Sequence, residues 1–360
     1  MKKYLITATL LGIGLLIPLS GWADTYCGVD DDLDGTVEIL CPGKDADNDG
    51  FPSQMDCDDT NPNIFPNPAV ATKTGCSSNE ARTCQLTNGI ASWSSCSSGG
   101  WKPSDCTTAI YVDPTNGSDT TGNGTFANPY QTGTRFNSYY SGGEPGGYVT
   151  LSAGYCVVIR AGTWTAQHTY NTGKFGIIIS GRNGSSSQPI TVTAYADEVV
   201  TFDMSHTDTA QVPISARNGS YIRVANLRIT DSYCGYGGVQ GDQACLAVVS
   251  DNSEAFNNTV WDNWGSSGDN LAGIYTHSAA NVRIHHNKVY DNFLDFACGG
   301  LCTNILWYRG TGTIIDHNLV MFSGSRTDRI NLKNKHSNFT SWHRVYGNVF
   351  IRGGVDLGGP

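Results

Sequence analysis

The sequence predicts an all-β protein whose main domain is a parallel β-helix, preceded by a small disulfide-rich module with a calcium-binding loop. Three observations support this prediction: a pattern that returns about every 30 residues, turn-forming Gly, Ser and Asp between its copies, and an acidic, cysteine-rich N-terminal region. A fixed period of this length is typical of a solenoid. Because the copies read as short strands and not as helices, the solenoid is expected to be a parallel β-helix.

Each copy of the repeat has an apolar residue, a polar pair, an Asn and a further apolar pair. The clearest copies are 284–289, 315–320 and 345–350, with fainter ones at 224–229 and 258–260. The marker positions are separated by 31, 29, 31 and 30 residues and are Leu227, Asn258, Asn287, Asn318 and Asn348. Asn tolerates the left-handed backbone conformation, so each strand is expected to bend at its Asn. Matched residues on adjacent coils would then stack about 4.8 Å apart and form an Asn ladder.

The first 23 residues predict a secretory signal peptide that is removed from the mature protein. Lys2 and Lys3 precede an apolar run over residues 4–18, and Gly21 and Ala23 provide small residues for cleavage. The run is shorter than a membrane span, and no second run follows it. We therefore expect no membrane span and an exported protein, in the bacterial periplasm, at the cell surface or outside the cell.

Three regions are expected after the signal peptide: Asp/Cys-rich calcium-binding repeats over 24–75, a small Cys-rich module or linker over 76–108, and the β-helix over 109–360. Residues 24–106 hold 14 acidic and 4 basic residues, whereas residues 107–360 hold 18 and 16. The acidity therefore belongs to the front end, and no basic stripe suggests a nucleic-acid partner. The last repeat starts a coil near Trp342 and stops within it, which predicts a truncated or poorly capped end.

The twelve cysteines of an exported chain predict disulfides. Cys234 with Cys245, and Cys298 with Cys302, are expected as local pairs. A zinc site at Cys298 and Cys302 is the alternative. Export favours oxidation, and no second ligand pair has suitable spacing, so the disulfide interpretation is preferred.

A twelve-position acidic loop predicts a Ca²⁺ site. Alternate carboxylates around a Gly turn bring hard oxygen ligands to one point, and the expected ligands at positions 1, 3, 5, 7 (a backbone carbonyl), 9 and 12 are Asp45, Asp47, Asp49, Phe51, Ser53 and Asp56. Position 12 is Asp where an EF-hand has Glu, and prolines on both sides exclude flanking helices. The loop is therefore expected to bind calcium without an EF-hand switch.

A looser copy of the acidic pattern precedes this loop and adds the candidate ligands Asp30, Asp32, Asp34 and Glu38. The continuation Asp56-Cys57-Asp58-Asp59 resembles the metal-binding repeats of bacterial secreted proteins and thrombospondin type 3 repeats. A region this poor in apolar residues cannot fold by burial alone, so the metal would be structural. The alternative is a solvated acidic turn region held by disulfides.

From residue 110 the chain resembles the secreted right-handed parallel β-helix superfamily of pectate lyase-like proteins. The resemblance rests on residues 111–119, 157–164 and 188–192, and it covers about 250 residues. It implies the fold and an action on carbohydrate. It does not imply one reaction, because the same coil carries lyases, hydrolases, epimerases and non-catalytic adhesins.

Residues 326–336 contain five basic groups in an otherwise nearly neutral domain. Alternation predicts that Ile330 and Leu332 are buried and that Asn331 and Lys333 point outward. The segment resembles the strand-borne Lys of the chondroitinase B and alginate lyase group, although a second copy of that group's Arg motif is missing. The resemblance implies a catalytic set of Lys333, Arg329 and His336, and a substrate-binding set of Arg326, Lys335, Arg352 and Trp342. The alternative is a solvated basic strand edge.

Other polar side chains offer weaker sites. His286 and His317 share a register on successive coils and predict either a metal or catalytic pair or, by preference, two solvent-facing stacked rings. Three carboxylates on neighbouring coils would suit glycoside hydrolysis, which needs a pair about 5 to 9 Å apart: Asp291, Asp295 and Asp316. Five aromatic residues are candidates to stack on sugar rings, and some of them are expected to be in the core instead: Trp261, Trp264, Trp307, Tyr308 and Trp342.

Two functions of different classes follow from these features. The preferred hypothesis is an exported polysaccharide lyase that cleaves a uronate-containing acidic polysaccharide by β-elimination, with Lys333 as the base. The alternative is a non-catalytic, calcium-stabilised surface, adhesin or polysaccharide-binding protein.

Overall fold

The structure is a computed structural model of the 360-residue chain. It describes residues 45–357 except 78–79, 98–99, 137–148, 166–174, 205–211, 235–241, 266–269, 294–301, 324–329 and 335–341. The predicted signal peptide and the looser acidic copy with Asp30, Asp32, Asp34 and Glu38 lie outside these residues. Within the described ranges, no helix has both the length and the apolar character that a membrane crossing requires.

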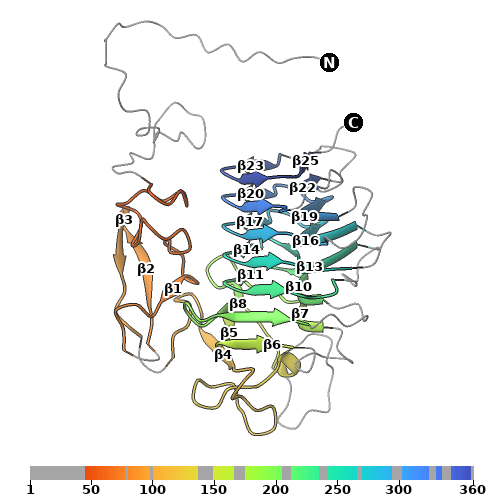
Figure 1. The fold of residues 1–360 in the computed structure, drawn as a ribbon. Coiled ribbons are helices and arrows are strands. Elements are labelled where there is room, and N and C mark those ends of the chain that lie inside the picture. Colours follow the sequence, from red (N-terminus) through yellow and green to blue (C-terminus); the bar gives the residue numbers. More distant parts are fainter. Residues whose placement is uncertain are drawn as a thin grey trace, which may run out of the picture. The chain divides into compact units, whose positions relative to one another are not determined.

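Three parallel sheets form the predicted β-helix; after an opening strand in one sheet, each coil contributes one strand to each sheet. Figure 1 shows the strands of successive coils stacked in order along the solenoid. Every neighbouring pair within these sheets is parallel, and residues about 30 positions apart are register partners, as in Ala255 with Ile284 and Ile284 with Ile315. The prediction of a parallel β-helix is confirmed.

The first sheet has seven strands, and most of them are longer than the strands that the same coils contribute to the other two sheets. They are β7 (Phe175–Ser180), β10 (Val212–Ser220), β13 (Asp242–Asp251), β16 (Asn270–His277), β19 (Cys302–Tyr308), β22 (Ile330–Asn334) and β25 (Gly354–Asp356).

The second sheet has eight strands and includes the start of the solenoid. They are β4 (Thr108–Val112), β5 (Tyr155–Ile159), β8 (Ile190–Ala194), β11 (Ile222–Ala225), β14 (Glu254–Phe256), β17 (Arg283–His285), β20 (Ile314–Asp316) and β23 (Arg344–Tyr346).

The third sheet has seven strands, joined to the second sheet by a tight corner in each coil from β11 onward. They are β6 (Gly162–Trp164), β9 (Val200–Asp203), β12 (Arg228–Thr230), β15 (Thr259–Trp261), β18 (Lys288–Tyr290), β21 (Leu319–Met321) and β24 (Val349–Ile351). One turn of 3-10 helix, η1 (Gly133–Arg135), lies between β4 and β5.

The core of the solenoid is a continuous apolar cluster built from the inward-facing residues of all three sheets. In the middle coils its members are small and branched, as with Val224, Ile284, Val289 and Ile305, which are fully or almost fully buried. β-Branched side chains suit this position because they pack well on a pleated surface. Burial of one such side chain stabilises the fold by about 1.5 to 3 kcal/mol.

The corner between the second and third sheets turns at the residue before each ladder position, which corrects the sequence prediction. The residues with positive φ are Asn226 (60°), Asn257 (52°), His286 (54°), His317 (51°) and Gly347 (64°). The ladder residues Asn258, Asn287 and Asn318 follow the bend and are buried, with their amides inside the coil. Only the residue before each of them has the left-handed backbone that Asn, Gly and some His residues adopt more readily than others.

The predicted Asn ladder is confirmed. Each Asn Oδ1 accepts a hydrogen bond from the backbone N–H of the marker residue one coil earlier, at 2.9 to 3.2 Å, through Leu227, Asn258, Asn287, Asn318 and Asn348. Each Nδ2 donates to neighbouring backbone carbonyls, as Asn287 does to Ala255 and His285 at 2.9 Å. The buried amides are therefore fully paired, as a low-dielectric interior requires.

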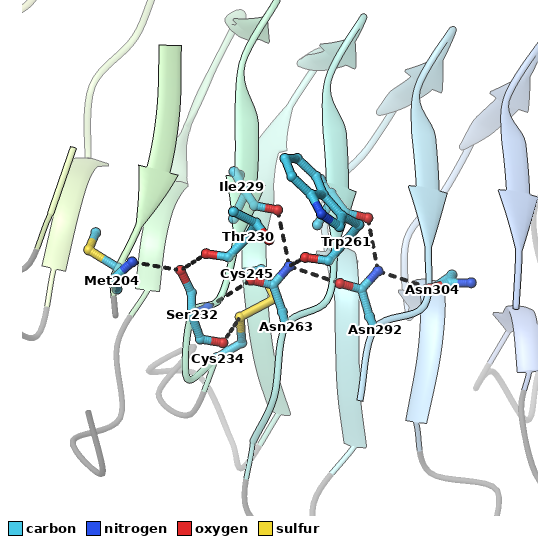
Figure 2. Close-up of a disulfide and its surroundings, with 11 residues drawn as sticks. Met204, Ile229, Thr230, Ser232, Cys234, Cys245, Trp261, Asn263, Asn292 and Asn304 are labelled. Atoms are coloured by element: carbon cyan, nitrogen blue, oxygen red, sulfur yellow. Dashed lines mark hydrogen bonds between the residues drawn. A yellow bond between two sulfur atoms is a disulfide. The ribbon is translucent and has the colours of Figure 1, made fainter. Parts of the chain in front are cut away.

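A second ladder runs through the coil at another corner and was not predicted. Asn263 Nδ2 donates to Asn292 Oδ1 at 2.8 Å, and Asn292 donates to Asn304 Oδ1 at 2.9 Å (Figure 2). Asn304 continues the chain of amides to Asn331 at 3.1 Å. At the other end Ser232 replaces Asn, and its backbone N–H donates to Asn263 Oδ1.

The N-terminal module, which precedes the β-helix, contains a small antiparallel sheet. Its strands are β1 (Ala71–Thr72), β2 (Arg82–Thr87) and β3 (Ile90–Trp93). Two disulfides, Cys57–Cys84 and Cys76–Cys96, hold it together, and Cys106–Cys156 ties it to β5 of the solenoid.

The cysteine predictions are confirmed where the structure describes them. Cys234–Cys245 is a disulfide inside the coil (Figure 2). Cys302 is also disulfide-bonded, which excludes the alternative of a zinc site on its thiolate. Its expected partner, Cys298, lies outside the described residues.

Candidate functional site

The acidic loop (residues 45–59) gathers carboxylates from the positions that the sequence pattern predicts. Two groups of three carboxylates have oxygens within 4.8 Å of one another: Asp47, Asp49 and Asp56, and Asp45, Asp47 and Asp59. Asp59 was not in the predicted ligand set; its proximity to the loop comes from the chain folding back after Asp56. Its Oδ1 accepts a hydrogen bond from the backbone N–H of Ala46 at 2.9 Å, which fixes that return.

Each central carboxylate uses one oxygen to hold the loop and leaves the other without a partner. Asp49 Oδ1 accepts from the Phe51 N–H at 2.8 Å, and Asp56 Oδ1 accepts from the Asp58 N–H at 3.0 Å. The second oxygens of Asp47, Asp49 and Asp56 are buried and have no hydrogen-bond partner. Asp49 and Asp56 are only 1% and 6% exposed. Uncompensated buried carboxylates are costly, so these oxygens need a cation or a proton.

The pKa values of these carboxyls also indicate that the loop needs a cation or a proton. Burial, reinforced by the neighbouring carboxylates, raises the pKa of Asp49 to about 8 and those of Asp47 and Asp56 to about 6. Hydrogen bonds from backbone N–H groups oppose the shift without cancelling it. Hard oxygen ligands from alternate Asp residues around a turn fit Ca²⁺.

The turn itself is shaped by Gly50, as the loop pattern expects at its sixth position. Gly50 has a φ of +93°, and a Cβ there would lie 2.9 Å from the Nε2 atom of His317. The glycine is therefore needed for the turn and also for the approach of the loop to the solenoid.

The acidic loop packs on the second sheet through His286. His286 Nε2 donates a hydrogen bond to the backbone carbonyl of Asp49 at 2.6 Å. His286 also stacks on the ring of Phe65 at 4.3 Å and on His317 at 5.2 Å. One residue, Asp49, thus offers its carboxylate to the candidate metal centre and its carbonyl to the β-helix.

An apolar contact surrounds this hydrogen bond. Residues of the segment that follows the acidic loop form a buried cluster with the outer face of the second sheet, comprising Ile64, Phe65, Ala69, Val70, Ala225 and Phe256. Asn257 Nδ2 donates to the Asn63 carbonyl and Asn226 Nδ2 to the Ala69 carbonyl, at 2.9 and 2.7 Å. The corner residues of two coils therefore hold the segment in place.

The predicted pair of His286 and His317 is stacked, but both side chains are half-buried and not freely solvent-facing. Burial lowers the pKa of His286 to about 4 and holds the pKa of His285 well below its ordinary value. His285 and His286 share one hydrogen bond between their Nδ1 atoms at 2.8 Å. With pKa values this low both rings are neutral, and His286 carries its proton on Nε2, so its Nδ1 accepts the hydrogen bond that His285 Nδ1 donates. The correction arises because the acidic loop, far away in sequence, covers the rings.

The predicted carboxylate pair for hydrolysis is not supported. Asp316 is fully buried and bound by Arg283 at 2.6 Å and by His317 Nδ1 at 3.0 Å. Burial opposes ionisation, yet these two partners hold the pKa of Asp316 well below its usual range. Asp291 accepts a bond from the Ser323 N–H, and Asp295 lies outside the described residues. Asp316 is therefore part of a structural ion pair.

Lys333 lies on the outer face of the first sheet, as predicted. Its register partners on the neighbouring strands are Leu306 and Asp356, and the next residue inward, Leu332, is in the core. The prediction that Asn331 also points outward is wrong, because its side chain points inward into the second ladder and is fully buried. A register irregularity between Ile330 and Leu332 lets two consecutive residues face the interior.

The outer face of the first sheet also carries an aromatic and basic cluster. His277 is buried and lies 4.9 Å from the ring of Tyr308 and 6.0 Å from that of Tyr275. The guanidinium of Arg309 lies over the Tyr308 ring. Of this group, only Tyr308 was predicted from the sequence.

The remaining members of the predicted substrate site are partly outside the described residues. Arg326, Arg329, Lys335 and His336 lie there. Arg352 occupies a turn and donates to the Ser323 carbonyl at 2.7 Å. Trp342 is 91% exposed. Their predicted roles therefore stay predictions.

The predicted aromatic platforms differ in exposure. Trp307 is buried in the core, so it is one of the aromatic residues that were expected to be core and not platform. Trp261 and Tyr290 stack on adjacent coils at 6.0 Å and are partly exposed, and Trp264 packs edge-on against Tyr233.

No known family model matches this sequence, and no curated protein is similar to it. Among solved structures, the chain is similar to a rhamnogalacturonan lyase (17% identity, TM-score 0.36), covering 70% of this chain and 63%, less than two thirds, of that one. It is also similar to pectate lyase Pel9A (14%, 0.36, covering 70% and 78%) and to a GH136 lacto-N-biosidase from Eubacterium ramulus (10%, 0.33, covering 68% of each). These values are too low to carry an argument about activity.

Proposed function

We propose that this chain is an exported, calcium-stabilised β-helix protein that cleaves an acidic polysaccharide by β-elimination. The observation that supports the enzymatic part is the position of Lys333, which is half-buried on the outer face of the first sheet. On the same face Tyr308 is partly exposed and lies against the buried His277.

The calcium part of the proposal rests on the three buried carboxylate oxygens without partners. Asp45, Asp47, Asp49, Asp56 and Asp59 would hold the ion. The Phe51 carbonyl and Ser53, together with water, would complete the six to eight ligands that Ca²⁺ takes. The ion would neutralise the loop and fix its shape, so its role is structural and not catalytic.

In the proposed reaction, Lys333 as the free amine removes the proton from C5 of a uronate residue. The electron pair moves toward C4, the C4–O bond breaks, and the leaving oxygen takes a proton, which leaves a C4–C5 double bond. A guanidinium beside the carboxylate makes the C5 proton more acidic by stabilising the developing negative charge. By the family resemblance, Arg329 or Arg352 would have this role.

The test is the absorbance at 232 nm of the unsaturated product. The protein is mixed with alginate, pectate or glycosaminoglycans in Ca²⁺, and Lys333→Ala is compared with Lys288→Ala. Lys288 is an exposed lysine on the third sheet, so its removal controls for charge and stability. We expect turnover that Lys333→Ala abolishes and Lys288→Ala retains. Absence of product with every substrate, or full activity of Lys333→Ala, would refute the lyase proposal.

A second candidate is a non-catalytic, calcium-stabilised polysaccharide-binding or adhesin protein. It is favoured by the separation of roles in the structure: the candidate metal centre supports the second sheet, whereas Lys333 lies on the first. Binding of a polysaccharide without any 232 nm product would support this candidate, and turnover that depends on Lys333 would exclude it.

A further inference from the structure

A polar groove lies where the segment after the acidic loop meets the corners of the β-helix. Its volume is about 270 Å³. One wall consists of Asn61, Asn63 and neighbouring residues of the N-terminal module, and the other of coil corners and the start of the third sheet. This groove is on a different sheet from Lys333, and neither the lyase proposal nor the metal centre explains it.

The groove offers both hydrogen-bond donors and acceptors. Asn257 Nδ2 donates a hydrogen bond to the Asn63 carbonyl, whereas Asn257 Oδ1 is buried and has no hydrogen-bond partner. The exposed Arg228 has no ion pair with any residue that the structure describes, and Thr259, its register partner on the next coil, adds a hydroxyl. A buried acceptor without a donor is costly unless a ligand or water supplies one.

The same groove also has apolar surface and balanced charge. Val199, 46% exposed, lines it together with Val200 and Leu227. Its two carboxylates are already compensated: Glu198 by Lys73 and Arg160, and Asp197 by hydrogen bonds from Thr72 and Lys73. An acidic chain in this groove would be attracted by one guanidinium, that of Arg228, and would lie near the two carboxylates of Asp197 and Glu198. The groove therefore does not favour an acidic chain.

We infer that this groove binds a short segment of a neutral polysaccharide. Sugar hydroxyls would donate to Asn257 Oδ1 and accept from Arg228 and Thr259, and the C–H face of a ring would cover Val199. Ligand pockets are usually about 300 to 1,000 Å³, so a groove slightly below this range fits one or two sugar rings and not a long chain. The inference does not depend on cleavage at Lys333, but it requires the N-terminal module to stay docked.

The test is isothermal titration of the full chain in Ca²⁺ with cello-, xylo-, manno- and galactohexaose, and with oligogalacturonate as the acidic comparison. We expect at least one neutral hexaose to bind. Arg228→Ala should weaken that binding about tenfold or more, since hydrogen bonds to a charged group contribute about 1.5 to 3 kcal/mol. Thr259→Val, which keeps the shape, should weaken it about threefold to tenfold.

Lys288→Ala is the matched control, because Lys288 lies in the same outward column one coil beyond Thr259 and outside the groove. Its affinity should equal that of the unchanged protein, and its far-UV circular dichroism should match those of the other variants. Failure of all four neutral hexaoses to bind, binding of oligogalacturonate alone, or equal affinity of Arg228→Ala would overturn the inference. None of these outcomes affects the 232 nm assay, so the lyase proposal is tested separately.

Discussion

The acidic loop and the β-helix bury polar groups in opposite ways. In the ladder, the amide oxygens of Asn258, Asn287 and Asn318 accept hydrogen bonds from one adjacent coil, and their amide nitrogens donate to the next Asn. In the loop, Asp47, Asp49 and Asp56 each keep one buried oxygen without a partner. The solenoid therefore supplies its own compensation for buried polar atoms, whereas the loop depends on something added from solution.

The largest effect is expected from breaking the ladder in the middle of the coil. Asn287→Ala removes the acceptor of the buried Asn258 backbone N–H and the amide donor to the Ala255 and His285 carbonyls, and should lower the free energy of unfolding by about 3 to 5 kcal/mol. Urea unfolding monitored by circular dichroism measures it. Asn348→Ala, near the exposed end of the coil, is the matched control and should cost less. A loss below about 1 kcal/mol for Asn287→Ala would contradict the role given to the ladder.

Removal of Ca²⁺ tests the dependence of the acidic loop on an added ion. If the loop binds the ion only when folded, Ca²⁺ at 100 times its Kd should stabilise the protein by about 2.7 kcal/mol. Thermal unfolding in Ca²⁺ and after chelation measures this difference. Asp49→Asn should remove most of the response, whereas Asp291→Asn, a carboxylate outside the loop, should keep it. A response unchanged in Asp49→Asn would place the ion elsewhere.

The metal-free protein should also show an unusual pH dependence. Burial raises the pKa of Asp49 to about 8 and those of Asp47 and Asp56 to about 6, above the unfolded value near 4. The folded loop therefore binds more protons than the unfolded chain, and its contribution to stability is lost as the pH rises from about 4 through 8.

The lowered pKa values of His285 and His286 act in the opposite direction, because their cost at low pH disappears as the pH rises through about 6.5. Melting temperatures of the chelated unchanged protein and of chelated Asp49→Asn at pH 5 and pH 8 therefore isolate the loop: the unchanged protein should lose more stability, or gain less, than the variant. An equal pH dependence of the two would contradict the prediction, and saturating Ca²⁺ at pH 8 should restore the stability that the loop loses.

The smallest effect is expected at the contact between the two regions. His286→Ala removes the hydrogen bond to the Asp49 carbonyl and should weaken Ca²⁺ binding about fivefold to tenfold, equivalent to about 1 to 1.4 kcal/mol. By reciprocity, Ca²⁺ should stabilise the variant less than it stabilises the unchanged protein by the same free energy. Calorimetric titration with Ca²⁺ measures the first quantity and thermal unfolding the second. Equal affinity in His286→Ala would show that loop and solenoid are energetically independent.

The sequence was a good guide wherever contacts repeat. A period of about 30 residues is amplified by stacking, so the spacing of Leu227, Asn258, Asn287, Asn318 and Asn348 was enough to place them in one ladder. The same spacing argument could have predicted the second ladder, since Asn263 and Asn292 each follow an Asn of the first ladder by five residues. It was not predicted because Ser232 interrupts it at one end and Asn304 and Asn331 enter from another strand.

For the candidate site, the local pattern predicted the carboxylates of the acidic loop but not their surroundings. The alternate Asp residues and Gly50 are a short-range pattern, because the ligands of one ion come from one turn. The burial of His286 under that loop depends on a contact across 237 residues, and no short-range pattern predicts it. The same holds for Asp316, whose ion pair with Arg283 reaches across adjacent coils.

The amino-acid sequence was therefore sufficient to specify the solenoid, its ladder and the composition of the acidic loop, because each follows from a local period or spacing. Packing in three dimensions was needed to establish which side chains face inward at irregular strand positions such as Asn331. It was also needed to show that the acidic loop rests on His286 and that a groove forms beside Asn257. The physical reason is that burial and hydrogen-bond partners are properties of the packed surfaces, and these surfaces meet only after distant segments have docked.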